Sequence, residues 1–432
     1  MGSMDRNTVI GFVLLAVLLF LYLFMSTKSS QELAMQKKHQ EDSIAAVKRV
    51  QDSIRIATDT TARLNTGDTT AQRQVIAEQL QVLENDEVKI TFTNKGGQPK
   101  QVLLKKYKSA NDGSPVILAG TAFDKISYPV NTGTNQTAQV SELFFTSSLE
   151  NKGNSQVLTY QHTTAGGQTI THLFTLKNGE YLVDWNIQLN GADRLLTQGA
   201  LNFTWQNQSV KLEKDAQYER QMASVCFYED EDFDYIQTKT SKKLEKPVQW
   251  ISVSQQFFNT TLIAKNNFNG ADITFQKSTD TSNAIAQATT TMQAKLPLGA
   301  IAAFPLQLYY GPNDYKILKR QAPEMDKIVN LGRDFYAFVR PINKYIVMPV
   351  FDFFHSFIGS LGIVIALLTI FIRLLTSPLV YTSYLSGAKM KALRPEIDQL
   401  KAKYGSDQQQ IGVEQMKLFR EAGVNPLGGC IP

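Results

Sequence analysis

The stretch Ile358–Tyr381 constrains this chain more than any other part of its sequence. It holds 24 mostly apolar residues, and Arg373 is the only charged residue among them. At about 1.5 Å of rise per residue, a helix of this length spans the roughly 30 Å hydrocarbon core of a bilayer. The sequence therefore predicts a membrane-spanning helix over 358–381 that carries one positive charge.

Arg373 shares one face of this predicted helix with three hydroxyl side chains. Thr369, Arg373, Thr376 and Ser377 are spaced at i, i+4, i+7 and i+8. A charge inside a span costs roughly 2.5–3.5 kcal/mol on insertion scales and usually faces a partner, a cavity or a pathway. An alternative stays open. If Pro378 ends or kinks the helix, Arg373 lies roughly 7–8 Å from its end and can reach the lipid headgroups.

The N-terminal segment holds a second uncharged stretch. Thr8–Met25 contains 18 uncharged residues between Arg6 and Lys28. A cleaved signal peptide is the alternative, but its core is usually shorter and no A-x-A type site follows. We therefore predict a transmembrane signal anchor over residues 1–28. Residues 29–78 are rich in polar side chains, which predicts a flexible tether.

Residues 79–322 change to a period of two, which is typical of β-strands. Two alternating runs, 170–176 and 181–189, flank Asn178–Gly179, and this pattern predicts a β-hairpin with a tight turn. Similar runs occur at 88–92, 201–205 and 304–310. Many such strands with polar, glycine-containing turns predict an all-β periplasmic sandwich.

Residues 323–357 have a helical period. Their apolar side chains step by three and four along Ile328, Leu331, Phe335, Phe338, Ile342 and Tyr345. Lys327, Arg333, Asp334 and Lys344 fall off this stripe, and Pro341 kinks the helix or starts a second one. Such a stripe usually packs in a soluble core, but its place before a membrane span favours an amphipathic helix at the membrane interface.

The segment 382–427 follows the predicted span and is predicted to form an αα-hairpin. One apolar stripe runs along Met390, Leu393, Ile397, Leu400 and Tyr404. After the break at 405–407, a second helix over 408–422 carries Val413, Met416 and Phe419. The basic residues beyond the span predict a cytoplasmic location by the positive-inside rule. The candidate contact residues of this hairpin are Lys389, Lys391, Arg394, Lys401 and Lys403.

Composition and motifs argue against several classes of function. The formal net charge of +5 over 432 residues does not suggest a nucleic-acid-binding protein. Cys226 and Cys430 lie in segments that we place on different sides of the membrane, so we expect neither a disulfide nor a metal site. The four histidines are scattered, and no P-loop, G-x-G-x-x-G or G-x-S-x-G sequence occurs. We therefore expect no cofactor, no metal and no catalytic residues.

A set of motifs in the C-terminal part carries a family resemblance. The set consists of Ile372-Arg373 with Pro378-Leu379, Ala388-Lys389-Met390, Leu393-x-Pro395-x-Ile397, Tyr404-Gly405 and the run from Val424 to Cys430. This part resembles the YidC family of membrane protein insertases, the bacterial branch of the Oxa-type insertases. The anchor, the tether and the β-domain fit the Gram-negative form of the family. Gly96-Gly97 followed by Leu104 and Tyr107 is similar to the start of its periplasmic domain.

The resemblance implies an insertase and chaperone that moves transmembrane segments of nascent proteins into the bacterial inner membrane without ATP. It places Arg373 in a hydrophilic groove, with Thr369, Thr376 and Ser377 beside it. Burial of the apolar substrate helix would drive the transfer. The implied partners are nascent membrane proteins and lipids, with the Sec translocon and the ribosome as further candidates and no direct contact with nucleic acid. The implied location is the inner membrane, as a multi-pass protein.

The resemblance leaves a second possible function open, and the chain differs from the family in the number of its spans. It implies a β-sandwich similar to sugar mutarotases, although a fold does not confer that activity. The alternative function is therefore a membrane-tethered periplasmic carbohydrate-binding module or mutarotase-like enzyme. The family has five core spans, and this chain contains only the first, Ile358–Tyr381. We expect residues 428–432 to start a missing transmembrane segment, so that the chain is truncated at its C-terminus.

Overall fold

The structure is a computed structural model that describes residues 77–133, 136–278, 283–297, 299–405 and 407–423. The chain divides into two compact units, and each is described by itself. One unit is Gln74–Lys344, and the described residues of the other begin at Tyr345. The predicted N-terminal anchor, most of the tether and residues 428–432 lie outside the described residues.

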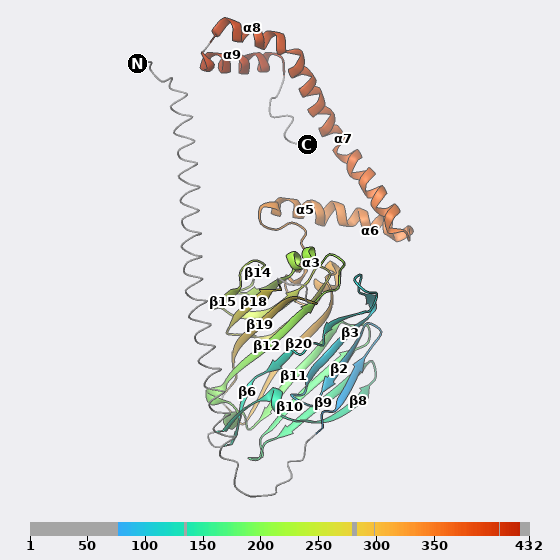
Figure 1. Ribbon diagram of the computed structural model, residues 1–432, viewed down its shortest axis with the longest axis vertical. Helices are drawn as coiled ribbons and strands as arrows, with labels where there is room; N and C mark the ends of the chain where they lie inside the picture. Colours follow the sequence, from blue (N-terminus) through green and yellow to red (C-terminus); the bar gives the residue numbers. More distant parts are fainter. Residues whose placement is uncertain (1–76, 134–135, 279–282, 298, 406, 424–432) are drawn as a thin grey trace, which may run out of the picture. The chain divides into compact units, whose positions relative to one another are not determined.

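The unit Gln74–Lys344 is built almost entirely from β-strands (Figure 1). Its strands are β1 Leu80–Glu84, β2 Val88–Thr93, β3 Gln98–Lys108, β4 Pro115–Ala119, β5 Lys125–Ser127, β6 Pro129–Gly133, β7 Gln136–Gln139, β8 Thr146–Lys152, β9 Ser155–Thr163, β10 Thr169–Lys177, β11 Leu182–Asn190, β12 Ala200–Val210, β13 Ser224–Glu229, β14 Asp232–Ile236, β15 Ser241–Leu244, β16 Val248–Ser254, β17 Phe258–Phe268, β18 Gly270–Lys277, β19 Ala284–Lys295 and β20 Ile301–Pro312. Short helical turns interrupt them at η1 Val140–Glu142, α2 Ala192–Leu195, η2 Thr197–Gly199, α3 Ala216–Met222, α4 Tyr315–Leu318 and η3 Met325–Ile328.

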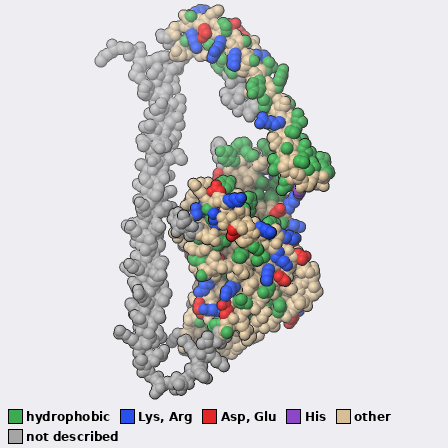
Figure 2. Space-filling view, turned by 45° about the vertical axis from the view of Figure 1, so that its right-hand side comes forward, with side chains coloured by type: hydrophobic (Ala, Val, Ile, Leu, Met, Phe, Trp, Pro, Cys, Tyr) green, Lys and Arg blue, Asp and Glu red, His purple; other side chains and the backbone are tan. Residues whose placement is uncertain are grey.

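Four sheets organise these strands. The largest has nine strands in the order β14-β13-β16-β17-β20-β11-β10-β9-β8, so that β14 and β8 are its two edges. A five-stranded sheet has the order β15-β18-β19-β12-β5, a four-stranded sheet the order β1-β2-β3-β4, and β6 pairs with β7. All of these pairings are antiparallel. Charged side chains are dispersed over the outer surface of this unit (Figure 2).

The β10–β11 hairpin shows how the sequence produces this sheet. β10 and β11 pair with Phe174 opposite Trp185, and alternate side chains along both strands are buried. Gly179 in the turn has a φ of +72°, a left-handed conformation that glycine adopts without steric cost. The predicted hairpin around Asn178–Gly179 is confirmed, and β2, β12 and β20 coincide with the other alternating runs.

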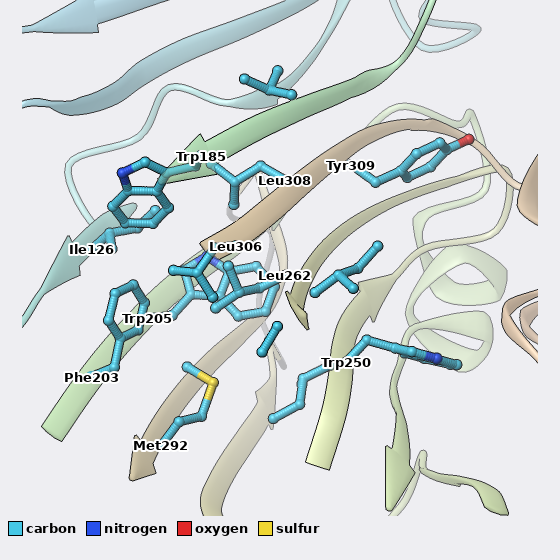
Figure 3. Packing of buried hydrophobic residues seen from close by; sticks show 14 of the residues in the cluster. Ile126, Trp185, Phe203, Trp205, Trp250, Leu262, Met292, Leu306, Leu308 and Tyr309 are labelled. Atoms are coloured by element: carbon cyan, nitrogen blue, oxygen red, sulfur yellow. The ribbon is translucent and has the colours of Figure 1, made fainter. Parts of the chain in front are cut away.

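Aromatic side chains join the sheets into one core (Figure 3). Trp185 of β11 lies 5.6 Å from Phe203 of β12 between ring centroids, which connects the nine-stranded sheet to the five-stranded sheet. Phe92 of β2 lies 4.7 Å from Phe174 of β10, which connects the four-stranded sheet. Burial of such rings is the main favourable term in the folding of a domain like this. The predicted all-β sandwich is therefore confirmed.

The sandwich extends beyond the predicted boundary at 322, and the predicted amphipathic helix over 323–357 begins later than expected. Met325 and Ile328 lie in the short turn η3 and are buried in the core of the sandwich. Leu331 is not helical, and Gly332 has a φ of +131°, which breaks the helical path. Helical structure resumes at η4 Asp334–Val339 and continues as α5 Arg340–Ile342, η5 Asn343–Val347 and α6 Met348–Phe357. The stripe therefore does not lie on one helix.

Three longer helices follow in the described part of the chain: α7 Leu361–Ala392, α8 Arg394–Tyr404 and α9 Gln408–Glu421. Within the described residues, α7 is the one helix long and apolar enough to cross a membrane. Hydrophobic side chains gather along the segment that contains α6 and α7, whereas lysine and arginine side chains are frequent on α8 and α9 (Figure 2). Pro378 lies inside α7 and does not end it, so the helix extends 11 residues past the predicted end at Tyr381.

The apolar face of α9 agrees with the predicted one at Phe419 but not at Val413 and Met416. Ile411 and Phe419 are its buried residues, whereas Val413 and Met416 are each 57% exposed. The helix begins at Asp407, whose carboxylate accepts a hydrogen bond from the backbone N–H of Gln410 at 3.1 Å. This cap fixes the start of α9.

Candidate functional site

The predicted polar stripe lies on α7. The helix places Thr369, Arg373, Thr376 and Ser377 within an arc of about 100°, because each residue advances the helix by roughly 100°. Arg373, Thr369 and Ser377 are exposed, and Thr376 is half-buried. The structure therefore places all four predicted groove residues on one accessible face of the helix.

The threonine hydroxyls of this face are bonded to their own helix. Thr369 Oγ1 donates to the carbonyl oxygen of Ile365 at 2.8 Å, and Thr376 Oγ1 donates to that of Ile372 at 2.9 Å. Both hydroxyl oxygens keep lone pairs that can accept a further hydrogen bond. Among the described residues, the guanidinium of Arg373 contacts no hydrogen-bond acceptor or carboxylate. Arg373 is thus the charged group of this face, and none of the described residues neutralises it.

Pro378 affects the backbone of α7 on another side of the helix. Proline has no N–H, so it cannot donate to the carbonyl of Leu374 one turn earlier. A helix that continues through a proline therefore leaves that carbonyl without its helical partner. This acceptor does not belong to the polar stripe, because residue 374 lies roughly 100° around the helix from Arg373.

Arg373 lies near the middle of an extended stretch without other charged side chains. It follows His355 by 18 residues and precedes Lys389 by 16 residues. The helix continues from Arg373 to Ala392, which is about 28 Å of rise. The helix does not end at Pro378, so its C-terminal end lies well beyond Arg373.

The five predicted basic residues after the span are all exposed: Lys389, Lys391, Arg394, Lys401 and Lys403. Lys401 Nζ lies 3.9 Å from Asp398 on the same helix, and such an exposed pair contributes little to stability. Lys403 Nζ lies 5.2 Å from the centroid of the Tyr404 ring. These charges are therefore accessible to an anionic partner.

A cavity of about 660 Å³, which we term the exit cavity, lies at the end of the β-domain where the chain leaves the sandwich. Residues 328–334 cover it, and further lining comes from the ends of β13, β14 and β16, from the residue after β20, and from residues 336–343. Six of its lining residues carry carboxamides: Gln237, Gln255, Gln256, Asn313, Asn330 and Asn343. The sequence interpretation missed this site, because these amides are dispersed along the chain and no local pattern brings them together.

Arg333 holds the covering segment against strand β14. Its guanidinium carbon lies 4.5 Å from the ring centroid of Tyr235, and its Nη2 donates to the carbonyls of Lys327 and Ile328 at 2.6 and 2.8 Å. Tyr235 Oη donates to Asp334 Oδ2 at 2.6 Å. Arg333 and Asp334, which the sequence pattern placed off the apolar stripe, are thus structural contacts of the β-domain.

A second cleft of the β-domain contains a carboxylate and a phenol that are hydrogen-bonded to each other. Glu87 lies in this cleft of about 770 Å³. Its carboxylate accepts a hydrogen bond from Tyr181 Oη at 2.6 Å and forms an ion pair with Lys106. Burial by itself would raise the pKa of Glu87, but these two partners outweigh it and hold the pKa below its usual value. Burial and Glu87 raise the pKa of Tyr181. Neither group is therefore adjusted to exchange a proton near neutral pH.

The acidic residues between β13 and β14 form a tight turn. Asp230 and Glu231 have φ values of +52° and +63° and form the tight turn of this hairpin. The aromatic residues beside them, Phe227, Tyr228, Phe233 and Tyr235, lie on the two strands and not in a loop. Within the described residues, no three histidine, cysteine or acidic side chains form a group that could hold a metal ion.

Two family models match the chain. The model of the YidC periplasmic domain matches residues 80–345, and the model of the 60Kd inner membrane protein matches residues 353–432. The first match covers the β-domain together with the segment that covers the exit cavity. The second covers α7, α8 and α9.

The chain is similar over almost its whole length to several proteins named membrane protein insertase YidC. The one from Amoebophilus asiaticus is 31% identical over 442 residues, with 99% of this chain and 72% of the relative covered. The one from Cytophaga hutchinsonii is 34% identical over 457 residues, with 99% and 71% covered. The chain thus spans about seven tenths of the length of these relatives.

Among solved structures, sugar mutarotase relatives show a distant likeness. A galactose mutarotase related enzyme from Lactobacillus acidophilus matches 54% of this chain and 97% of its own chain, with 8% identity and a TM-score of 0.35. A galactose mutarotase-like protein from Lactobacillus casei matches 54% and 100%, with 11% identity and a TM-score of 0.36.

Proposed function

This chain belongs to the YidC family of membrane protein insertases, and we propose that Arg373 on α7 receives polar segments of the proteins that it inserts. The family consists of inner membrane insertases and not of enzymes, and the β-domain is its periplasmic domain. The proposal concerns how this chain's own residues contribute to insertion.

The observation that carries the proposal is the guanidinium of Arg373 within an apolar helix, where no described residue pairs with it. A charge buried in hydrocarbon without a partner is strongly disfavoured, so Arg373 requires a water-containing groove. In such a groove a positive charge attracts a carboxylate more strongly than in water, because the effective dielectric constant is lower. An acidic or polar segment would therefore pause beside Arg373 while its hydration is partly removed.

The remaining groove residues make this face polar without adding charge. The hydroxyl oxygens of Thr369, Thr376 and Ser377 can accept hydrogen bonds from a passing polypeptide. The apolar part of the substrate then moves from the groove into lipid, and burial of its side chains drives this step without ATP. Further spans of a multi-pass protein would close the groove around this face.

The basic residues after the span complete the proposal. Lys389 and Lys391 on α7 and the charges on α8 would lie on the cytoplasmic side, as the positive-inside rule requires. There they would attract anionic lipid headgroups or the acidic surface of a partner. The Sec translocon and the ribosome are the partners for which this surface is suited, alongside the nascent membrane protein itself.

An insertion assay with paired substrates tests the role of Arg373. In a full-length protein that contains the further core spans, Arg373→Ala should impair insertion of substrates with acidic translocated segments, whereas Arg373→Lys should impair it less, because lysine keeps the charge but loses the guanidinium fork. Leu375→Ala is the matched control, since Leu375 lies on the opposite face of α7. Equal insertion of acidic and neutral substrates by the wild type and the alanine variant would reject the groove role.

A further inference from the structure

The segment over the exit cavity is also the connection between the β-domain and the helices α6 and α7. We propose that residues 329–343, which we term the strap, open from the sandwich as one segment and lengthen this connection while the sandwich stays folded. Fully extended, the 15 residues of the strap span about 50 Å. The strap thus sets how far the β-domain can move. The inference goes beyond the proposed function and does not depend on the role of Arg373.

The first argument is the loose packing of the strap. Just before it, Met325 and Ile328 are 0% and 6% exposed and belong to the core of the sandwich. Within the strap, Tyr336 and Phe338 are 64% and 68% exposed, and the strap lines the exit cavity of about 660 Å³. Hydrophobic stabilisation scales with the apolar area removed from water, so opening the strap loses little of it. Segments of this kind are those that open locally in a folded domain.

The second argument is that the closed strap contains two unfavourable groups. Asp334 has a φ of +50°, a left-handed conformation that costs a non-glycine residue free energy and persists only where the surroundings hold it. Here the hydrogen bond from Tyr235 Oη to Asp334 Oδ2 holds it. Arg333 Nε is buried and has no hydrogen-bond partner among the described residues, and a buried donor in this state is also costly. Opening the strap relieves both costs.

The third argument is the latch that opposes opening, which consists of Arg333, Asp334 and Tyr235. The guanidinium of Arg333 stacks on the ring of Tyr235 and donates to two carbonyls just before the strap, while the Tyr235 hydroxyl bonds Asp334. Another hydrogen bond lies inside the strap, because Asn343 Nδ2 donates to the carbonyl oxygen of Leu331 at 2.8 Å. That bond can persist when the latch releases, so the strap can leave the sandwich as one segment.

Cys226 reports on the opening. It is fully buried and lies opposite Tyr235 in the pairing of β13 with β14. Burial raises the pKa of its thiol, and the nearby positive charge of Arg333 acts in the opposite direction. The thiol therefore becomes accessible when Arg333 moves away with the strap. In the full chain with Cys430→Ser, Cys226 is the remaining cysteine, so its rate of labelling by a water-soluble aromatic disulfide measures the opening.

Thiol labelling of this membrane-embedded chain at low urea concentration tests the inference with a matched pair of variants. Tyr235→Phe removes the hydroxyl of the latch and keeps the ring, so labelling of Cys226 should become about tenfold faster. Tyr181→Phe is the control, because it removes a bond of the same 2.6 Å length from a phenol to a carboxylate, that of Glu87, in the second cleft. Its labelling rate should equal that of the wild type.

Distances between spin labels follow the movement itself. Gly332→Ala should favour the open strap, because Gly332 has a φ of +131° and an added Cβ would lie 2.6 Å from the carbonyl oxygen of Tyr336. In a cysteine-free background, labels at the exposed Lys239 and Phe338 should show a second, longer distance whose population rises in Gly332→Ala. A control pair at Lys239 and Leu149, both within the sandwich, should keep one distance in both proteins.

The urea dependence of labelling separates local opening from global unfolding. Opening of the strap exposes little surface, so the labelling rate should depend only weakly on urea. A rate with the urea dependence of global unfolding overturns the inference, as does equal acceleration by Tyr235→Phe and Tyr181→Phe. One unchanged distance between residues 239 and 338 in Gly332→Ala overturns it as well. None of these measurements involves Arg373, so their failure leaves the groove proposal standing.

Discussion

His172 and Tyr128 share a hydrogen bond of 2.7 Å between Nε2 and the phenol oxygen in the buried core of the β-domain. The opposite nitrogen of His172, Nδ1, lies 2.8 Å from the carbonyl oxygen of Gly97, which can only accept. Nδ1 therefore carries the proton, and Tyr128 donates to Nε2. This arrangement specifies a neutral imidazole, and burial accordingly lowers the pKa of His172 to about 4.

The first prediction is a pH-dependent stability of the β-domain. The unfolded chain binds a proton at His172 near pH 6.5, whereas the folded domain does so only near pH 4, so the free energy of unfolding falls as the pH falls through this window. The loss should reach about 3 kcal/mol. Denaturant titrations of the wild type and His172→Gln between pH 7 and pH 4 measure it. The glutamine variant should lose the dependence, and the control His162→Gln should keep it.

The second prediction concerns the contact between Arg333 and Tyr235. Arg333→Ala removes the stacking on Tyr235 and the bonds to two carbonyls, so the segment 329–339 should open more often. Hydrogen exchange of this segment should become about tenfold or more faster. Arg320→Ala is the control, because Arg320 is exposed and lies outside this contact. Unchanged exchange in Arg333→Ala would show that the contact does not restrain the segment.

The sequence predicted some of these structural features and not others. The period of two at 170–189 predicted β10 and β11 correctly, because each strand buries one face and the Asn-Gly turn fixes their register. The stripe from Ile328 to Tyr345 failed as a helix, because Met325 and Ile328 are used by the sandwich core. The exit cavity could not be predicted at all, since Gln255 and Arg333 meet only through tertiary structure.

A third prediction follows from the extended boundary of the sandwich. A fragment of residues 79–344 should be soluble, β-rich by circular dichroism and cooperative in unfolding. A fragment of residues 79–322 should be less stable by about 3 kcal/mol or more, because it lacks the buried Met325 and Ile328. Denaturant midpoints compare the two fragments, and equal midpoints would contradict the assigned core. Neither fragment should catalyse aldose mutarotation.

The fourth prediction is topological. We expect a cysteine at Thr60 to react with a membrane-impermeant reagent added outside spheroplasts, and one at Lys401 to be protected. The background variant replaces Cys430 and the buried Cys226. Lys401 is exposed on α8, so protection there reports the membrane and not the fold. Reaction at Lys401 in intact spheroplasts would reverse the proposed orientation of α7.

The unbroken course of α7 has a mechanical consequence. The helix carries Arg373 and, four to five turns later, Lys389 and Lys391, and only Leu393 separates it from α8. Because α7 is one continuous helix, the angle about its axis between Arg373 and the lysines is set by the helix, at roughly 100° per residue. A partner that binds Lys389 and Lys391 therefore also sets the direction in which the guanidinium of Arg373 points.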